Sequence, residues 1–157
     1  MKIYFLDTSA LVKRYHQEVG TDIIDKIFRE EDKELFISDL SIIEFHSAIA
    51  LKVRTREISR DAFSHLIGLF SNELDIGLYR VMRINEEEKQ EAVKLLTKYG
   101  FDYALRTMDS LQLASMESVG KEKVDWVVCT DARFCEIIRL NGFQVINPEE
   151  GGRIPGC

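Results

Sequence analysis

The chain alternates between short runs of apolar residues and longer stretches in which apolar residues recur every three or four positions. A short continuous apolar run is typical of a strand buried on both faces, and the longer spacing is typical of an amphipathic helix. Strands are expected at residues 3–6, 34–37, 79–84, 126–129 and 143–146. Helices are expected at residues 10–15, 22–31, 41–56, 60–74, 86–99, 110–119 and 132–140. Strands that alternate with helices predict an α/β domain with a mostly parallel central sheet.

The helix expected at residues 41–56 differs from the others in how its apolar residues are distributed. They cover more than one stripe of the helix: Ile42, Ile43, Phe45, Ala48, Ile49 and Leu51. A helix with one buried face needs only one such stripe. We therefore predict burial on two sides, and the surplus of apolar surface between Ser41 and Leu74 predicts a homodimer.

Length and composition describe an ordinary globular protein. At 157 residues the chain is most simply one domain with a full core, which we place at residues 1–148, followed by a flexible C-terminal tail at residues 149–157. No apolar run approaches the roughly 18 residues that span a bilayer, and no secretory signal opens the chain, so we expect a cytoplasmic protein without a membrane partner. Three cysteines lack ligand-like spacing and predict free thiols: Cys129, Cys135 and Cys157.

The formal net charge of −6 argues against a protein that coats nucleic acid, because such proteins are usually basic. It does not exclude an enzyme that binds phosphate through metal ions, since a cluster of acidic ligands lowers the formal charge and attracts phosphate once divalent cations fill it. One basic group lies at the end of the helix expected at residues 41–56 and just beyond it: Lys52, Arg54, Arg56 and Arg60. It is either a solvated helix end or a contact for an RNA backbone.

Acidic residues follow two of the apolar strands. Asp7 comes directly after the first strand, and Asp131 follows the fourth. The carboxyl ends of parallel strands meet at one edge of a sheet, where open α/β folds bind their ligands. Glu44 interrupts an otherwise apolar helix, and Asp109 stands near the start of another. Helix capping would explain Asp7 and Asp131 separately, and an ion pair with Arg106 would explain Asp109, whereas convergence of all four acids would form one site.

Four converging carboxylates would repel one another unless cations lay between them. Oxygen ligands without a histidine or cysteine cluster suit Mg²⁺ or Mn²⁺ rather than zinc. Such an ion lowers the pKa of water and polarises a phosphodiester, so the chemistry requires no histidine, serine or cysteine nucleophile. A carboxylate that is not bound to the ion is then available to accept a proton from the attacking water.

Four blocks of this sequence resemble the PIN-domain pattern, and most closely that of the VapC-type toxins. The blocks are Leu6-Asp7-Thr8-Ser9, Ser41-Ile42-Ile43-Glu44-Phe45, Arg106-Thr107-Met108-Asp109-Ser110-Leu111-Gln112-Leu113-Ala114 and Thr130-Asp131-Ala132-Arg133-Phe134. They follow the family's order with suitable spacing, and the resemblance runs from about residue 2 to residue 148. It implies a three-layer α/β/α domain that acts as a metal-dependent ribonuclease.

The resemblance also implies roles for individual residues. Four acids would hold one or two Mg²⁺ or Mn²⁺ ions: Asp7, Glu44, Asp109 and Asp131. Two residues would support the site through their hydroxyls: Ser9 and Thr130. The sequence departs from the pattern at Ser110 and Gln112, where a small residue and a histidine are often found. Arg133 stands where some members carry a further acid, which would weaken a second metal site.

The implied function is that of an endoribonuclease, the toxin of a toxin–antitoxin pair, whose antitoxin covers the acidic cleft with a basic side chain. The resemblance also implies a homodimer, in addition to the apolar content between Ser41 and Leu74. A phosphatase of the haloacid dehalogenase kind also begins with an aspartate after the first strand. That family needs a second aspartate two residues later, where this chain has Ser9, and a suitably placed lysine is missing. A third possibility is a PIN domain without activity that binds RNA or a protein.

Overall fold

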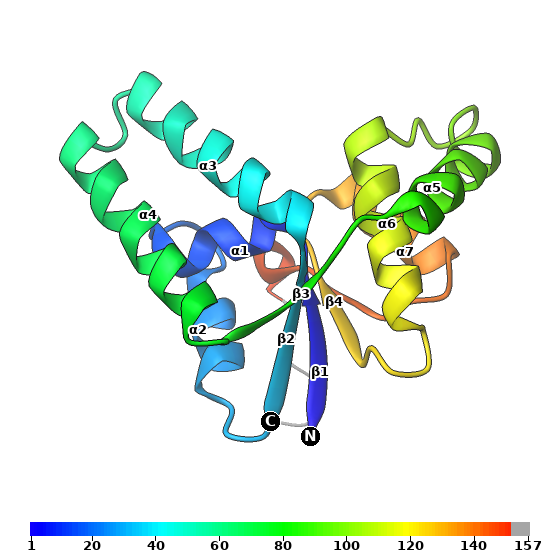
Figure 1. Cartoon of the computed structure of the whole chain (residues 1–157), viewed down its shortest axis with the longest axis horizontal. Coiled ribbons are helices and arrows are strands. Elements are labelled where there is room, and N and C mark those ends of the chain that lie inside the picture. The colour runs from blue at the N-terminus through cyan, green and yellow to red at the C-terminus, as the bar shows by residue number, and fades with distance from the viewer. Residues whose placement is uncertain (152–157) are drawn as a thin grey trace.

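A five-stranded sheet forms the centre of the molecule (Figure 1). The computed structural model describes residues 1–151. The strand order is β3-β2-β1-β4-β5, and every neighbouring pair is parallel. The strands are β1 (Lys2–Leu6), β2 (Lys33–Ser38), β3 (Tyr79–Met82), β4 (Trp126–Val128) and β5 (Val145–Ile146). This architecture confirms the predicted α/β domain with its parallel central sheet.

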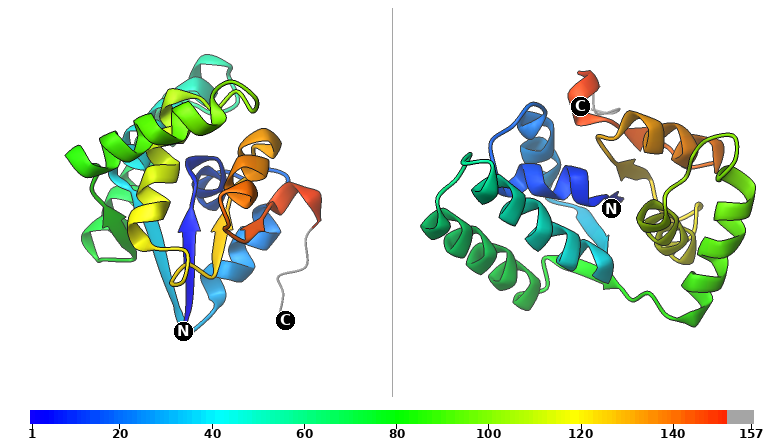
Figure 2. Two further views of the ribbon diagram at one scale, coloured as in Figure 1. Left: turned by 90° about the vertical axis from the view of Figure 1, so that its right-hand side faces the viewer. Right: turned by 90° about the horizontal axis from the view of Figure 1, so that it is seen from above.

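Helices cover both faces of the sheet and complete a three-layer α/β/α arrangement (Figure 2). One face carries α1 (Thr8–Tyr15), α2 (Thr21–Arg29), α3 (Asp39–Arg54) and α4 (Arg60–Asp75). The other face carries α5 (Glu86–Tyr99), α6 (Thr107–Val119) and α7 (Ala132–Leu140). Each face has its own apolar core, so the sheet is buried on both sides.

Strand β1 shows why a continuous apolar run predicted a central strand. Tyr4 and Leu6 belong to the core beneath α1–α4, whereas Phe5 belongs to the core on the opposite face, and all three are fully buried. This alternation follows from the two-residue period of a strand. β1 pairs with β2 on one side and β4 on the other, so its carboxyl end lies in the middle of the sheet edge.

Three strands are shorter than the sequence predicted. β3 ends at Met82, because the backbone N–H of Ile84 donates instead to the Asp39 carboxylate at 3.2 Å. β4 ends at Val128 rather than at Cys129, and β5 begins at Val145 rather than at Phe143. The Gln144 carbonyl still accepts from the Val127 backbone N–H at 2.8 Å, just before β5 begins.

Helices α3 and α4 form an arm that projects from the sheet (Figure 1). The rings of Phe45 and Phe70 anchor the arm with centroids 4.3 Å apart, and both side chains are fully buried. The two-sided burial predicted for α3 is wrong for the single chain: Ile43 is 68% exposed and Leu51 is 45% exposed. α1 and α4 cover only part of the helix surface, which leaves these apolar side chains in contact with solvent.

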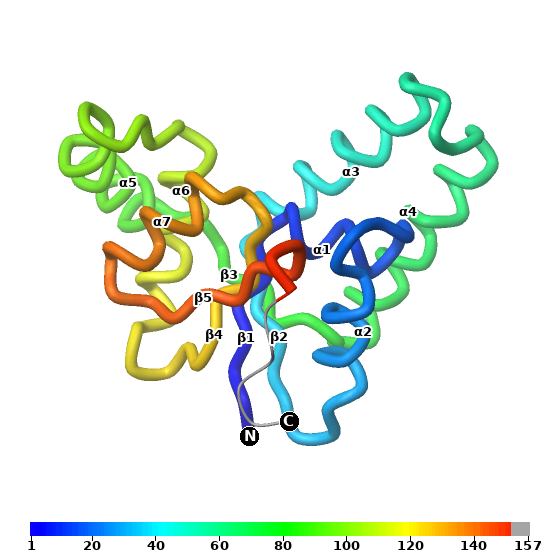
Figure 3. Tube along the Cα trace, turned by 180° about the vertical axis from the view of Figure 1, so that it is seen from behind, coloured from blue at the N-terminus to red at the C-terminus, as the bar shows by residue number. Residues whose placement is uncertain are grey.

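The end of the described chain packs against α1 and α2 (Figure 3). A short 3₁₀ helix, η1 (Pro148–Glu150), places Glu149 Oε1 at 2.7 Å from the buried Lys13 Nζ. Gly20, at φ +88°, permits the approach, since an added Cβ would lie 2.8 Å from Pro148 Cβ. The tail predicted from residue 149 therefore begins within this 3₁₀ helix, and residues 152–157 lie outside the described residues.

Two expectations from composition bear on the described residues. Cys129 and Cys135 are buried free thiols, as predicted, whereas Cys157 lies outside the described residues. No helix within residues 1–151 is long and apolar enough to cross a membrane.

Candidate active site

The strand order reverses at β1, and the predicted strand-end acids lie at that point. The chain passes outward from β1 to β2 and β3, and then returns to the other side of β1 with β4 and β5. Such a switch point leaves a crevice beyond the carboxyl ends of the two strands that flank it. Leu6 pairs with Val128, and the Asp7 backbone N–H donates to the Val128 carbonyl at 3.0 Å. This pairing of β1 with β4 places Asp7 and Asp131 at the same crevice.

A cleft of about 540 Å³ opens at this edge. Its lining comes from α1, α3, the start of α6 and the segment after β4: Asp7, Thr8, Ser9, Val12, Ile43, Glu44, Ser47, Ala48, Leu51, Arg54, Met108, Asp109 and Asp131. The structure thus brings together all four predicted acids and Ser9, while Thr130 does not line the cleft.

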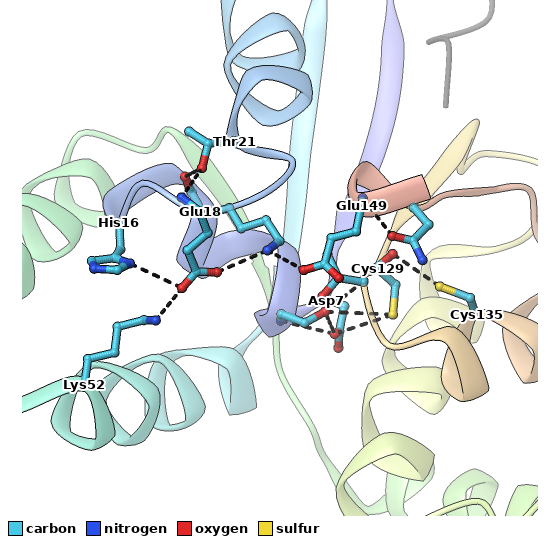
Figure 4. Close-up of polar contacts among 12 residues, drawn as sticks. Asp7, His16, Glu18, Thr21, Lys52, Cys129, Cys135 and Glu149 are labelled. Atoms are coloured by element: carbon cyan, nitrogen blue, oxygen red, sulfur yellow. Dashed lines mark hydrogen bonds and ion pairs between the residues drawn. The ribbon is translucent and has the colours of Figure 1, made fainter. Parts of the chain in front are cut away.

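Asp7 is buried at the floor of the cleft. Its Oδ2 accepts hydrogen bonds from the Ser9 hydroxyl at 2.6 Å and the Ser9 backbone N–H at 3.2 Å, so Asp7 also caps α1. The Cys129 thiol lies 3.7 Å from the same oxygen (Figure 4). Burial raises the pKa of the Asp7 carboxyl, the hydrogen bond from Ser9 opposes this rise, and the charge on Glu44 adds to it.

Ser9 connects the ends of the two central strands. Its hydroxyl donates to Asp7 and accepts from the backbone N–H of Thr130 at 3.1 Å. Within residues 1–151 the hydroxyl of Thr130 makes no hydrogen bond, so Thr130 contacts the site through its backbone. The resemblance implied a supporting role for both hydroxyls, and only that of Ser9 makes such a contact here.

Glu44 reaches the cleft from the second turn of α3. Its Oε1 accepts from Thr8 Oγ1 at 2.9 Å and from Gln112 Nε2 at 2.6 Å. Thr8 and Gln112 are buried, and sequence reasoning had assigned neither of them a role. Both lie inside the sequence blocks that resemble the PIN pattern. Those blocks indicated that a functional site lies near these two residues. Which acid they contact was not readable from that pattern.

Asp109 and Asp131 complete the acidic lining in different ways. Asp131 caps α7, because its Oδ1 accepts from the Phe134 backbone N–H at 2.9 Å. The Asp109 side chain makes no hydrogen bond within the described part of the chain. Burial raises the pKa of Asp109 to about 6, the charges on Asp7 and Asp131 add to the rise, and Arg106 acts against it. The predicted capping roles and the shared cleft therefore both occur in this structure.

The donor set suits a hard divalent cation, although the carboxylates do not form a closed cluster. All four carboxylates offer oxygen ligands around one cleft, and the negative charges of the other three raise the pKa of Asp109. Glu44 Oε2 and Asp131 Oδ2 have no hydrogen-bond partner among the described residues. Yet within residues 1–151 no three His, Cys, Asp or Glu side chains lie close enough together to hold a metal ion.

The basic residues at the end of α3 and beyond it lie in three different environments. Lys52 pairs with Glu18 and with Glu57, and Figure 4 shows the contact with Glu18. Arg54 lines the acidic cleft and forms no ion pair with any described residue. Arg60 borders a separate hollow between α3 and α4. Of this group, Arg54 alone both lines the acidic cleft and lacks a partner within the described chain.

Family comparison agrees with this geometry. A family model described as "PIN domain" matches residues 4–140. The chain belongs to the PIN-domain family. Among curated proteins, no match to this PIN domain was found by sequence.

Solved structures share the fold over nearly the whole PIN domain. VapC20 of Mycobacterium tuberculosis, described as a Sarcin-Ricin loop cleaving toxin, has a TM-score of 0.66 at 16% identity and covers 92% of this chain and 99% of its own. FitAcB from Neisseria gonorrhoeae has a TM-score of 0.62 at 14% identity, with coverages of 92% and 97%. DNA-bound VapBC from Salmonella typhimurium has a TM-score of 0.61 at 15% identity, with coverages of 94% and 99%. At such identities the likeness establishes the shared fold.

Proposed function

We propose that this PIN domain is an Mg²⁺- or Mn²⁺-dependent endoribonuclease and the toxin of a toxin–antitoxin pair. The observation that carries the proposal is the gathering of Asp7, Glu44, Asp109 and Asp131 around one cleft at the switch point of the sheet. The fold shared with VapC20, described as a Sarcin-Ricin loop cleaving toxin, supports the nuclease assignment. The buried thiols Cys129 and Cys135 agree with a reducing cytoplasm.

The residues of the cleft have different expected roles in catalysis. The four carboxylates would hold one or two divalent cations, and such a cation supplies Lewis acidity to the phosphodiester and eases deprotonation of water. Ser9 holds Asp7 in one orientation through the 2.6 Å hydrogen bond. Any of the four carboxylates that is not bound to a cation would be available to accept the proton of the attacking water.

A ribonuclease assay with and without metal tests this proposal. We expect cleavage of structured RNA in Mg²⁺ or Mn²⁺, and loss of that cleavage in saturating EDTA, with recovery when metal is restored. Cleavage that persists in EDTA would contradict a metal mechanism. The absence of cleavage under every metal condition would favour the alternative, an inactive PIN domain that binds RNA or protein. The open spacing of the acids is the one observation on that side.

The substrate path is inferred from one face of α3. Glu44, Leu51 and Arg54 lie seven and three residues apart on that face, and all three line the cleft. Glu44 and Arg54 are ten residues apart, which is about 15 Å along the helix axis. An RNA strand whose scissile phosphate lies at the acids therefore extends along α3 and places another phosphate near Arg54.

Arg54→Ala is expected to raise the KM for RNA several-fold and leave kcat near the wild-type value. Loss of one phosphate contact also lowers the slope of log affinity against log salt by about one. The matched control is Arg60→Ala, which removes a nearby arginine that borders another hollow. Equal effects of the two substitutions, measured at several salt concentrations, would show that Arg54 contributes only to the general surface charge.

We also propose that the protein forms a homodimer and binds a cognate antitoxin. The structure described as a toxin–antitoxin complex from Klebsiella pneumoniae shares the fold, as does DNA-bound VapBC, and this supports an antitoxin partner here. A basic side chain of that partner would neutralise the uncompensated acids of the cleft. A small protein with a DNA-binding amino end, encoded beside this gene, is the expected candidate.

The dimer prediction rests on exposed apolar side chains of the arm. Ile43, Leu51 and Leu69 are 68%, 45% and 43% exposed, respectively, on α3 and α4. Light scattering at micromolar concentration is expected to give twice the mass of the 18.1 kDa chain. Leu69→Lys, outside the cleft, is expected to shift the mass toward the monomer if this surface is the interface. A monomeric mass for the wild-type protein would refute the prediction.

A further inference from the structure

Gln112 occupies the centre of a buried hydrogen-bond network below the cleft. The side chain is 1% exposed and extends from α6 toward the end of β2, the start of α3 and the start of α1. Its Nε2 lies 2.6 Å from Glu44 Oε1, 3.0 Å from Ser41 Oγ and 3.2 Å from Thr8 Oγ1. Its Oε1 accepts from Ser38 Oγ at 2.9 Å. Both ends of the amide therefore have partners.

The chemistry of these partners determines how the amide is oriented. A carboxylate only accepts hydrogen bonds, so the NH₂ end of Gln112 must face Glu44. Ser38 then donates to the amide oxygen at the opposite end. Because the acceptor is ionised, the 2.6 Å contact belongs to the stronger, charge-assisted class of hydrogen bonds. The reversed orientation would place two acceptors against each other.

The network leaves one oxygen of Glu44 available. Thr8 and Gln112 both donate to Oε1, whereas Oε2 has no hydrogen-bond partner among the described residues. Glu44 lines the cleft, so the two donors hold its carboxylate by one oxygen at the cleft wall. Gln112 also follows Asp109 by three residues on α6, which places the two side chains on the same face of that helix.

We propose that Gln112 is a positioning residue that holds Glu44 for cation binding in the acidic cleft. This inference rests on the proposed metal-dependent function. Gln112 touches neither the cation nor the RNA; it restricts the rotamers of Glu44, so that less conformational entropy is lost when a cation binds. It also connects α6 with α3 and α1, and thereby sets the separation of Glu44 from Asp109 across the cleft.

Direct Mn²⁺ binding to the full chain tests the proposal without reference to activity. Gln112→Met keeps the length of the side chain and removes both donors, and we expect its dissociation constant for Mn²⁺ to rise about tenfold or more, as for other residues that orient metal ligands. Electron paramagnetic resonance of free Mn²⁺ gives that constant. Gln112→His, which restores one N–H donor, is expected to recover most of the affinity.

The matched control is Ser115→Ala on the same helix. Ser115 is fully buried, and its hydroxyl has no hydrogen-bond partner in the described structure, so its removal is expected to leave Mn²⁺ binding unchanged. Should Gln112→Met fail to fold by circular dichroism, Gln112→Asn replaces it, because it keeps an amide but retracts it from Glu44 by one methylene.

A double-substitution cycle separates positioning from a general structural role. If Gln112 acts through Glu44, the effect of Gln112→Met on Mn²⁺ affinity is expected to vanish in a Glu44→Gln background. An equal loss in both backgrounds would overturn the proposal, and so would wild-type affinity in a folded Gln112→Met protein. Absence of both Mn²⁺ binding and RNA cleavage in the wild-type protein would instead refute the proposed function itself.

Discussion

In EDTA, Asp7→Asn is expected to melt above the wild-type protein, although the same substitution is expected to lower RNA cleavage by more than about 100-fold. Asp7 is 6% exposed, and both its burial and the charge on Glu44 disfavour its ionised form. An amide removes that penalty and still accepts from Ser9, and asparagine caps helices as well as aspartate does. It does not supply the charge that a hard cation requires.

Divalent metal is expected to reverse this order of melting temperatures. At ten times its dissociation constant, one bound ion stabilises the wild-type protein by about 1.4 kcal/mol. For a domain of this size that corresponds to about 3–6 °C. The variant lacks one ligand and gains less, so differential scanning calorimetry with and without Mn²⁺ is expected to show the two curves crossing.

A charge-matched control separates relief of repulsion from a change in net charge. Asp22→Asn removes one exposed carboxylate in the first turn of α2, away from the cleft. Loss of that favourable helix-end charge is expected to lower stability slightly, with or without metal. If Asp7→Asn were destabilised equally in EDTA and in Mn²⁺, Asp7 would be a helix cap and the four acids would not share an ion.

The metal-free protein is expected to lose part of its stability as the pH rises from about 4 to about 6, through Asp109. Its pKa is raised from 3.8 to about 6 by burial first and then by the charges on Asp7 and Asp131. Between these values the folded state binds a proton that the unfolded state has released, so the free energy of unfolding falls with rising pH. The contribution is complete below pH 3.8 and is lost above about pH 6.

Comparison with Asp109→Asn isolates this effect. Burial opposes the shift at Glu18, but contacts with Lys52 and Lys13 lower its pKa, and contacts with Thr55 and Lys52 lower the pKa of Glu57. Both carboxylates act in the opposite direction to Asp109 and remain in both proteins. Urea titrations in EDTA are therefore expected to show a gap between variant and wild type that grows between pH 4 and pH 6 in favour of the variant. Asp102→Asn, an exposed control, is expected to show no such gap. A gap independent of pH would contradict the raised pKa of Asp109.

Local patterns in the sequence were sufficient to predict the elements of the fold and the residue types of the site. The apolar run before Asp7 identified β1, and a similar run identified β4 before Asp131. Period-two and helical spacing depend only on which side chains must leave water, so they can be read within a few residues. Four acids in the motif order of the PIN family then indicated the residues that line one cleft.

The tertiary structure alone decided which side chains meet. The sequence did not show that Gln112 contacts Glu44, because the two residues are 68 positions apart and meet only when α6 and α3 approach. Nor did it separate Lys52, which pairs with Glu18, from Arg54, which lines the acidic cleft. Composition describes the charge of such a group, but the partners of each side chain depend on the angle at which distant elements pack.

The same distinction explains the wrong prediction for α3. Its apolar residues correctly predicted an unusual helix, but the sequence could not state whether this chain or another molecule covers Ile43 and Leu51. A hydrophobic pattern indicates only that burial of a surface is favourable, and it does not specify which partner buries it. The order of the strands and the packing of α1 and α4 determine which part of that surface the chain itself buries, and they leave the rest beside the acidic cleft.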